Sequence, residues 1–162
     1  MSTFEQNDYK WRETYFVLFH AEKRPTLEAV AEALQGLNDK FELTNATADE
    51  DGGFESLTLR SPQDYAALDI SYVSGEEVLE QGAALAEEMK SFASDAQERA
   101  KLKRLTQCDA RLDVMHFEQV IDSPAEDELD EMLDPSTLLI ALDVLVELTG
   151  GIGVDPQSGA LM

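Results

Sequence analysis

The chain contains no lysine or arginine after Arg111. Residues 112–162 hold twelve Asp and Glu, which gives this stretch a formal charge of −12 within a total of −22. A surface with so much negative charge repels phosphate backbones and anionic lipid headgroups. The composition therefore predicts neither a nucleic acid nor a membrane as a partner, and it favours a basic protein.

Cysteine and long apolar runs are also scarce. Cys108 is the single cysteine, so no internal disulfide can form, and the first residues, MSTFEQNDYKW, have neither the basic nor the apolar region of a secretory signal. The most apolar run, residues 138–146, is interrupted by Asp143 and is far shorter than the roughly 20 residues of a membrane span. We therefore expect a cytoplasmic protein with no segment that crosses a bilayer.

Motifs of common catalytic sites are missing as well. The chain has no G-x-S-x-G serine motif and no G-x-x-x-x-G-K phosphate loop. With one cysteine and two histidines in the whole chain, a closed zinc site would need carboxylates to complete it. The sequence therefore predicts no cofactor and no metal, and it does not indicate a cofactor-using enzyme.

The length of 162 residues and the 43% hydrophobic content predict a single domain over residues 1–162. Its first half is βαββ-like and covers about residues 13–60. The apolar run at residues 13–20 predicts a strand, and apolar residues at helical spacing predict a helix at 27–37. Alternation at residues 41–46 and 54–60, on both sides of an acidic turn, predicts a hairpin.

Residues 67–106 are predicted to form a strand and a long linking helix. The strand covers residues 67–73, and Ser74 with Glu77 has the spacing of a capping box for a helix over residues 75–106. Apolar residues recur along this helix at steps of three and four. Its bases Arg99, Lys101, Lys103 and Arg104 lie at the predicted C-terminal end, where they complement the helix dipole.

A second βαββ-like half covers about residues 110–162. It contains a strand at 110–120, a short acidic helix to 133, a helix at 136–150 and a terminal hairpin at 152–162. Only Asp143 and Glu147 mark a polar side of the helix 136–150. We therefore expect this helix to be covered either by several neighbours in its own chain or by a second copy in a homodimer.

An internal echo relates two of the predicted strands. Residues 67–73, ALDISYV, align with residues 111–117, RLDVMHF, at a constant offset of 44. Together with the two βαββ-like halves, the echo predicts the α+β class, with an antiparallel sheet packed against helices and ferredoxin-like βαββ units. It also suggests a degenerate internal duplication.

The echo places two carboxylates, Asp69 and Asp113, at equivalent positions of the two strands. Each lies on the strand face opposite its apolar neighbours, so on adjacent strands the two could approach each other. Such a pair can shift a pKa or hold a divalent cation. The alternative is that both carboxylates face water on the outer side of a half-exposed sheet.

His116 and Glu118 form an H-x-E pair on one strand face, a spacing that two metal ligands can share. The downstream P-C-x-x-C of zinc deaminases is absent, and a histidine at the end of an apolar strand is commonly a core-edge residue. Asp69, Asp113, His116 and Glu118 are thus the candidate site residues.

Three functions are compatible with these patterns. The first is a non-catalytic cytoplasmic binding or regulatory protein whose acidic surface docks a basic protein partner, or which pairs with itself through the helix 136–150. The second is a divalent-metal-assisted enzyme that uses the paired strand carboxylates. The third is an inhibitor that mimics DNA, which requires carboxylates aligned in a stripe.

Overall fold

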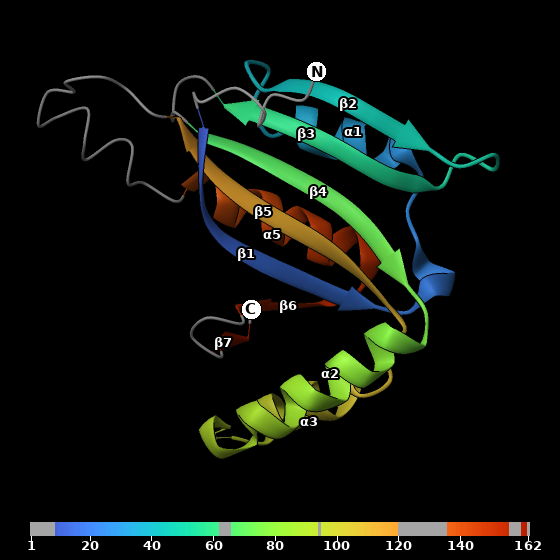
Figure 1. Cartoon of the computed structure of the whole chain (residues 1–162), viewed down its shortest axis with the longest axis vertical. Helices are drawn as coiled ribbons and strands as arrows, with labels where there is room; N and C mark the ends of the chain where they lie inside the picture. The colour runs from blue at the N-terminus through green and yellow to red at the C-terminus, as the bar shows by residue number, and fades with distance from the viewer. Residues whose placement is uncertain (1–8, 62–65, 94, 120–135, 156–159, 162) are drawn as a thin grey trace, which may run out of the picture.

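A computed structural model of the chain shows one seven-stranded sheet in which every neighbouring pair of strands is antiparallel (Figure 1). The structure describes residues 9–61, 66–93, 95–119, 136–155 and 160–161. The strands are β1 (Tyr9–Phe19), β2 (Glu42–Ala48), β3 (Phe54–Ser61), β4 (Ala66–Ser74), β5 (Ala110–Gln119), β6 (Ile152–Asp155) and β7 (Ala160–Leu161). The helices are α1 (Leu27–Gln35), α2 (Glu76–Met89), α3 (Ala96–Leu105) and α5 (Ser136–Thr149), with short 3-10 turns η2 (Ala21–Lys23) and η4 (Lys90–Phe92).

The α+β class predicted from the sequence is confirmed. The strand order is β2-β3-β4-β5-β1-β6-β7, so the first strand of the chain lies inside the sheet between β5 and β6. The element orders β1-α1-β2-β3 and β5-α5-β6-β7 both occur, but β6 pairs directly with β1 whereas β2 lies at the far edge. The two halves therefore occupy the sheet differently, and the ferredoxin-like detail of the prediction is not confirmed.

The echoed segments lie side by side as β4 and β5. Ala67 pairs with Phe117, Ile70 with Val114 and Val73 with Arg111, so the two segments match end to end. Because the strands run in opposite directions, the repeat in sequence becomes a local two-fold relation about the Ile70–Val114 pair. The predicted terminal hairpin is present as β6 and β7; the predicted short helix at 124–133 lies outside the described residues.

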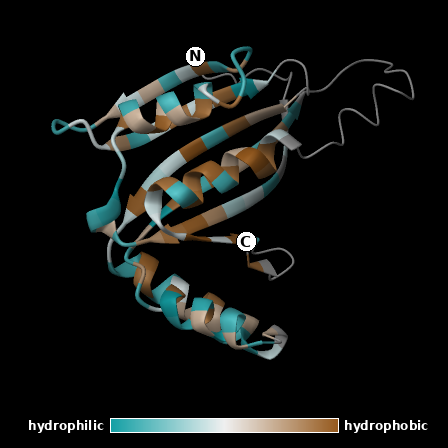
Figure 2. Ribbon diagram, turned by 180° about the vertical axis from the view of Figure 1, so that it is seen from behind, coloured by the Kyte–Doolittle hydropathy of each residue, from teal (hydrophilic) through white to brown (hydrophobic). Residues whose placement is uncertain are grey.

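One face of the sheet packs against α1 and α5 (Figure 2). Leu138, Ala141, Leu142 and Leu145 of α5 are each at most 1% exposed, and they belong to the same core as residues of β1, β3, β4 and β5. The apolar side of this helix is thus covered within its own chain. Its outer side keeps Leu139 and Ile140, each 41% exposed, next to Asp143 and Glu147.

The prediction of one long helix over residues 75–106 was wrong. Helix α2 ends at Met89 and α3 begins at Ala96, and the two pack side by side at the lower end of the sheet (Figure 1). Asp95 caps α3, since its Oδ1 accepts a hydrogen bond of 2.8 Å from the backbone N–H of Glu98. The Ser74 capping box is also absent: Gly75 is the N-cap of α2 at φ 125°, and no side chain caps it.

No helix among the described residues is both long enough and apolar enough to span a membrane.

The sheet face opposite α1 and α5 is only partly covered by helices. Figure 1 shows that the α2–α3 pair covers one end of this face. Over the rest of that face, along β4 and β5, no helix of the described residues is placed. The residues of this region form the candidate functional site.

Candidate functional site

Asp69 and Asp113 lie on the same face of adjacent strands. Asp69 pairs in register with Met115, and Asp113 pairs with Ser71. All four side chains point away from α1 and α5, because their alternate neighbours belong to the core on that side. Carboxylates related in this diagonal way have Cα atoms on the order of 7 Å apart. We call Asp69, Ser71, Asp113 and Met115 the carboxylate face.

The two carboxylates differ in their partners. Asp113 accepts a hydrogen bond of 2.6 Å from Nε of Arg111, whose guanidinium lies 4.8 Å from the ring centre of Phe16. Asp69 accepts only a long hydrogen bond of 3.4 Å from the hydroxyl of Thr58, and no cationic side chain of the described residues pairs with it. One member of the related pair thus has a cation and the other has none.

The internal echo explains this difference. Arg111 precedes Asp113 by two residues, so both side chains lie on one face of β5. The corresponding position two residues before Asp69 is Ala67, which has no charge to offer. Sequence analysis missed the role of Arg111, although the Arg-x-Asp spacing on a predicted strand was a signal that could have revealed it.

Burial changes the ionisation of both carboxylates. It raises the pKa of Asp69 above its ordinary value, and the hydrogen bond from Thr58 opposes this only in part. It also raises the pKa of Asp113, and here the attraction of Arg111 acts in the opposite direction without cancelling it. Each ionised carboxylate is therefore less favourable in the folded protein than in water.

Asp69→Asn should raise the free energy of unfolding at pH 7. The folded pKa of Asp69 is raised above the unfolded value of 3.8, so folding favours the protonated form. The cost of the ionised form is present at neutral pH and disappears as the pH falls through the folded pKa towards the unfolded one. Urea unfolding of both proteins should show a gain at pH 7 that vanishes below about pH 4.

Asp143→Asn is the matched control, because it makes the same chemical change at an exposed position of α5. Its effect should remain within about 0.5 kcal/mol at every pH. A loss of stability for Asp69→Asn at neutral pH would show that the chain itself stabilises the ionised carboxylate.

His116 and Glu118 lie on the other side of the sheet. His116 is 3% exposed and faces the core against α1 and α5, and its Nδ1 lies 3.2 Å from Oε1 of Glu13, its register partner on β1. Glu118 follows on the same face by alternation. The four candidate residues are therefore divided between two faces and do not form one site.

No group of three or more His, Cys, Asp or Glu side chains within the described part of the chain is arranged as a metal site. Asp69 and Asp113 thus have no third ligand from these residues.

A cavity of about 260 Å³ lies between α2 and the sheet next to this face. It is lined by Phe16, Gln81, Ala84, Leu85, Glu88 and Arg111. Arg111 thus belongs both to the carboxylate face, through Asp113, and to this cavity. Its side chain is 14% exposed and held in place by a carboxylate on one edge and an aromatic ring on one face.

The chain is thus an α+β protein in which the half-buried carboxylate face lies beside the helices α2 and α3. Comparisons with protein-family models, with curated proteins and with solved structures gave no match to this chain. The assignment of function therefore depends on the geometry of the chain alone.

Proposed function

We propose that the protein is a non-catalytic binding protein, whose carboxylate face docks a basic segment of a partner protein in the reducing cytoplasm. The observation that carries the proposal is Asp69, a half-buried carboxylate with which no cationic side chain of the described residues pairs. Its counterpart Asp113 already has Arg111 at 2.6 Å. A lysine or arginine from a partner would supply at Asp69 what Arg111 supplies at Asp113.

Two physical effects support a basic partner. A hydrogen bond between a charged donor and a carboxylate is about twice as strong as one between neutral groups, and partial burial reduces its screening by water. In addition, the net charge of −22 attracts a basic segment from a distance and increases its rate of association.

The other candidate functions have less support. A metal-assisted enzyme would have only Asp69 and Asp113 on one face, since His116 and Glu118 lie on the other, and the described residues supply no third ligand. A mimic of DNA needs aligned carboxylates, whereas exposed acids of the described residues lie on α1, α2 and α5, which cover both sides of the sheet. Self-association through α5 would use only its outer side, because the chain's own sheet covers the inner side.

Asp69→Asn should weaken binding of a basic peptide by at least about tenfold, because a hydrogen bond to a charged group contributes roughly 1.5–3 kcal/mol. The probe is a peptide selected on the parent protein from a phage-displayed random dodecapeptide library and labelled for fluorescence anisotropy. Its own Lys→Gln and Arg→Gln variants should lose affinity for the parent but not for Asp69→Asn.

Asp143→Asn, with the same change of net charge, should bind the peptide as the parent does. The proposal fails if the selected peptides are not enriched in lysine or arginine, or if Asp69→Asn binds them unchanged. Unfolding curves of the variants separate a binding defect from a folding defect, since we expect Asp69→Asn to be the more stable protein.

A further inference from the structure

The bases of this chain are concentrated in one place. Five of its twelve Lys and Arg lie between residues 90 and 104, at the end of α2 and along α3: Lys90, Arg99, Lys101, Lys103 and Arg104. In a single long helix the last four would complement the helix dipole. Because α3 begins at Ala96, Arg99 instead lies near its N-terminus, where the dipole disfavours a cation.

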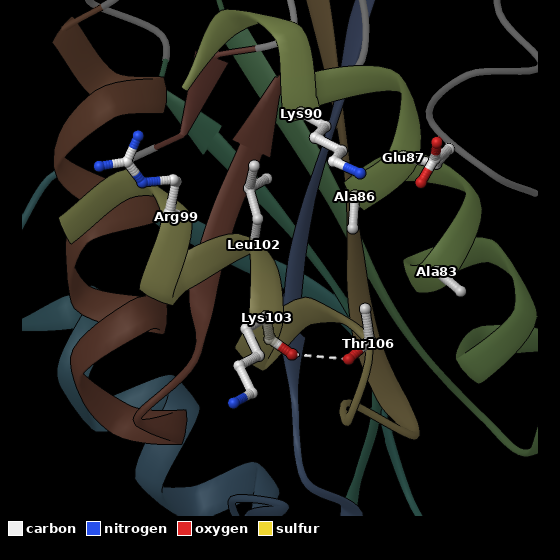
Figure 3. A pocket seen from close by; sticks show the side chains of 8 residues that line it. All are labelled: Ala83, Ala86, Glu87, Lys90, Arg99, Leu102, Lys103 and Thr106. Atoms are coloured by element: carbon white, nitrogen blue, oxygen red, sulfur yellow. Dashed lines mark hydrogen bonds between the residues drawn. The ribbon is translucent and has the colours of Figure 1, made fainter. Parts of the chain in front are cut away.

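Three of these bases surround a cavity. The α2–α3 cleft has a volume of about 310 Å³ and is lined by Ala83, Ala86, Glu87, Lys90, Arg99, Leu102, Lys103 and Thr106 (Figure 3). Ala86 and Leu102 are buried and come from the two facing helices. Figure 3 shows the long side chains of Arg99 and Lys103 extending outwards from α3, at the edge of the cleft. The cleft thus has an apolar floor and a charged rim.

The rim has an excess of positive charge. Lys90, Arg99 and Lys103 are exposed, and none of them forms an ion pair with another described residue. Among the described residues that line the cleft, Glu87 is the one acid. The chain has 34 acidic residues, yet none of the described ones forms an ion pair with these three cations, and the dipole of α3 does not account for the position of Arg99.

We propose that the α2–α3 cleft binds a small organic anion with a compact apolar body, such as an aryl-substituted carboxylate. The volume equals that of about ten water molecules and suits one ring with a short linker. The floor receives the apolar body, and the rim cations pair with the carboxylate at the mouth. Salt weakens the repulsion from carboxylates that lie more than a Debye length away, which is about 8 Å at physiological ionic strength.

This proposal is independent of the carboxylate face, since none of the lining residues belongs to it. The size of the cleft also favours a small molecule over a helix of a partner protein. An amphipathic helix places anchors at three or four positions along two turns and needs a longer groove than one cavity.

The test is a titration with 3-phenylpropionate, followed by NMR of the methyl groups and by calorimetry. We expect saturable binding that shifts the methyl signals of Ala83, Ala86 and Leu102. Lys90→Gln with Lys103→Gln should weaken binding about fivefold, given the usual strength of exposed ion pairs. Lys23→Gln with Lys40→Gln, which removes the same charge at exposed positions elsewhere, should leave it unchanged.

Two further measurements complete the test. The neutral analogue 3-phenylpropanol should bind clearly more weakly than the acid, and Ala83→Trp, which fills the mouth of the cleft from an exposed position, should prevent binding of both. The proposal is overturned if the acid does not bind or if the alcohol binds as tightly. Equal losses for the two double variants would also overturn it.

Discussion

Leu145→Ala should lower the free energy of unfolding by about 3 kcal/mol, the usual cost of a buried leucine truncated to alanine. Leu145 is 0% exposed and lies in the core between α5 and the sheet. Because residues of the same chain cover it, the loss should be the same at every protein concentration. Urea unfolding at two concentrations that differ a hundredfold measures both quantities.

Leu139→Ala is the matched control, since it makes the same change on the same helix at a side chain that is 41% exposed. Its cost should stay below about 1 kcal/mol. If a second copy covered α5, Leu139→Ala would cost as much as Leu145→Ala, and the unfolding midpoint would rise with protein concentration. The experiment therefore distinguishes a helix packed within its chain from one that forms a homodimer.

Local sequence patterns predicted most strands and helices because they depend on short-range chemistry. Alternation identified β2 and β3, and the wide apolar arc of α5 predicted a covered helix, whose inner side the sheet of the same chain covers. The order of the strands could not be read in the same way. The insertion of β1 between β5 and β6 depends on pairings between distant segments, which leave no local trace.

The division of the predicted long helix shows a different limit. Apolar residues at steps of three and four continue from Val78 through Met89 and beyond, and such a seam fits one helix or two equally well. Asp95 and Glu98 have the spacing of an N-terminal cap, and this signal outweighs the continuous seam in the structure. Because α3 begins at Ala96, Lys103 and Arg104 still lie in its last turn and complement its dipole, whereas Arg99 lies near its N-terminus and does not.

Part of the candidate site could be predicted from the sequence. The echo and strand alternation placed Asp69 and Asp113 on the strand face opposite their apolar neighbours. The same alternation places His116, three residues after Asp113, on the other face. The missing cation at Asp69 is visible once residues 67–73 and 111–117 are known to be paired strands. Which face the helices leave without cover depends on tertiary packing, so only the structure could identify it.

The contact between α2 and α3 gives the last prediction. Gly82→Ala should lower the free energy of unfolding by about 2 kcal/mol, although alanine favours an isolated helix by about 1 kcal/mol over glycine. A Cβ atom at Gly82 would lie 2.6 Å from the backbone oxygen of Leu105. A backbone atom cannot rotate away as a side chain can, so α3 must move and the buried contacts of Leu105 are disturbed.

Gln81→Ala, at the preceding exposed position of α2, should leave stability unchanged or slightly higher, because alanine is the better helix former and no atom is added that would meet a neighbour. Thermal unfolding of the two variants gives the comparison. Since the α2–α3 cleft is formed by the same two helices, Gly82→Ala should also weaken binding of 3-phenylpropionate, whereas Gln81→Ala should not. Gly82→Ala with the stability of Gln81→Ala would mean that the two helices pack less closely than the structure shows.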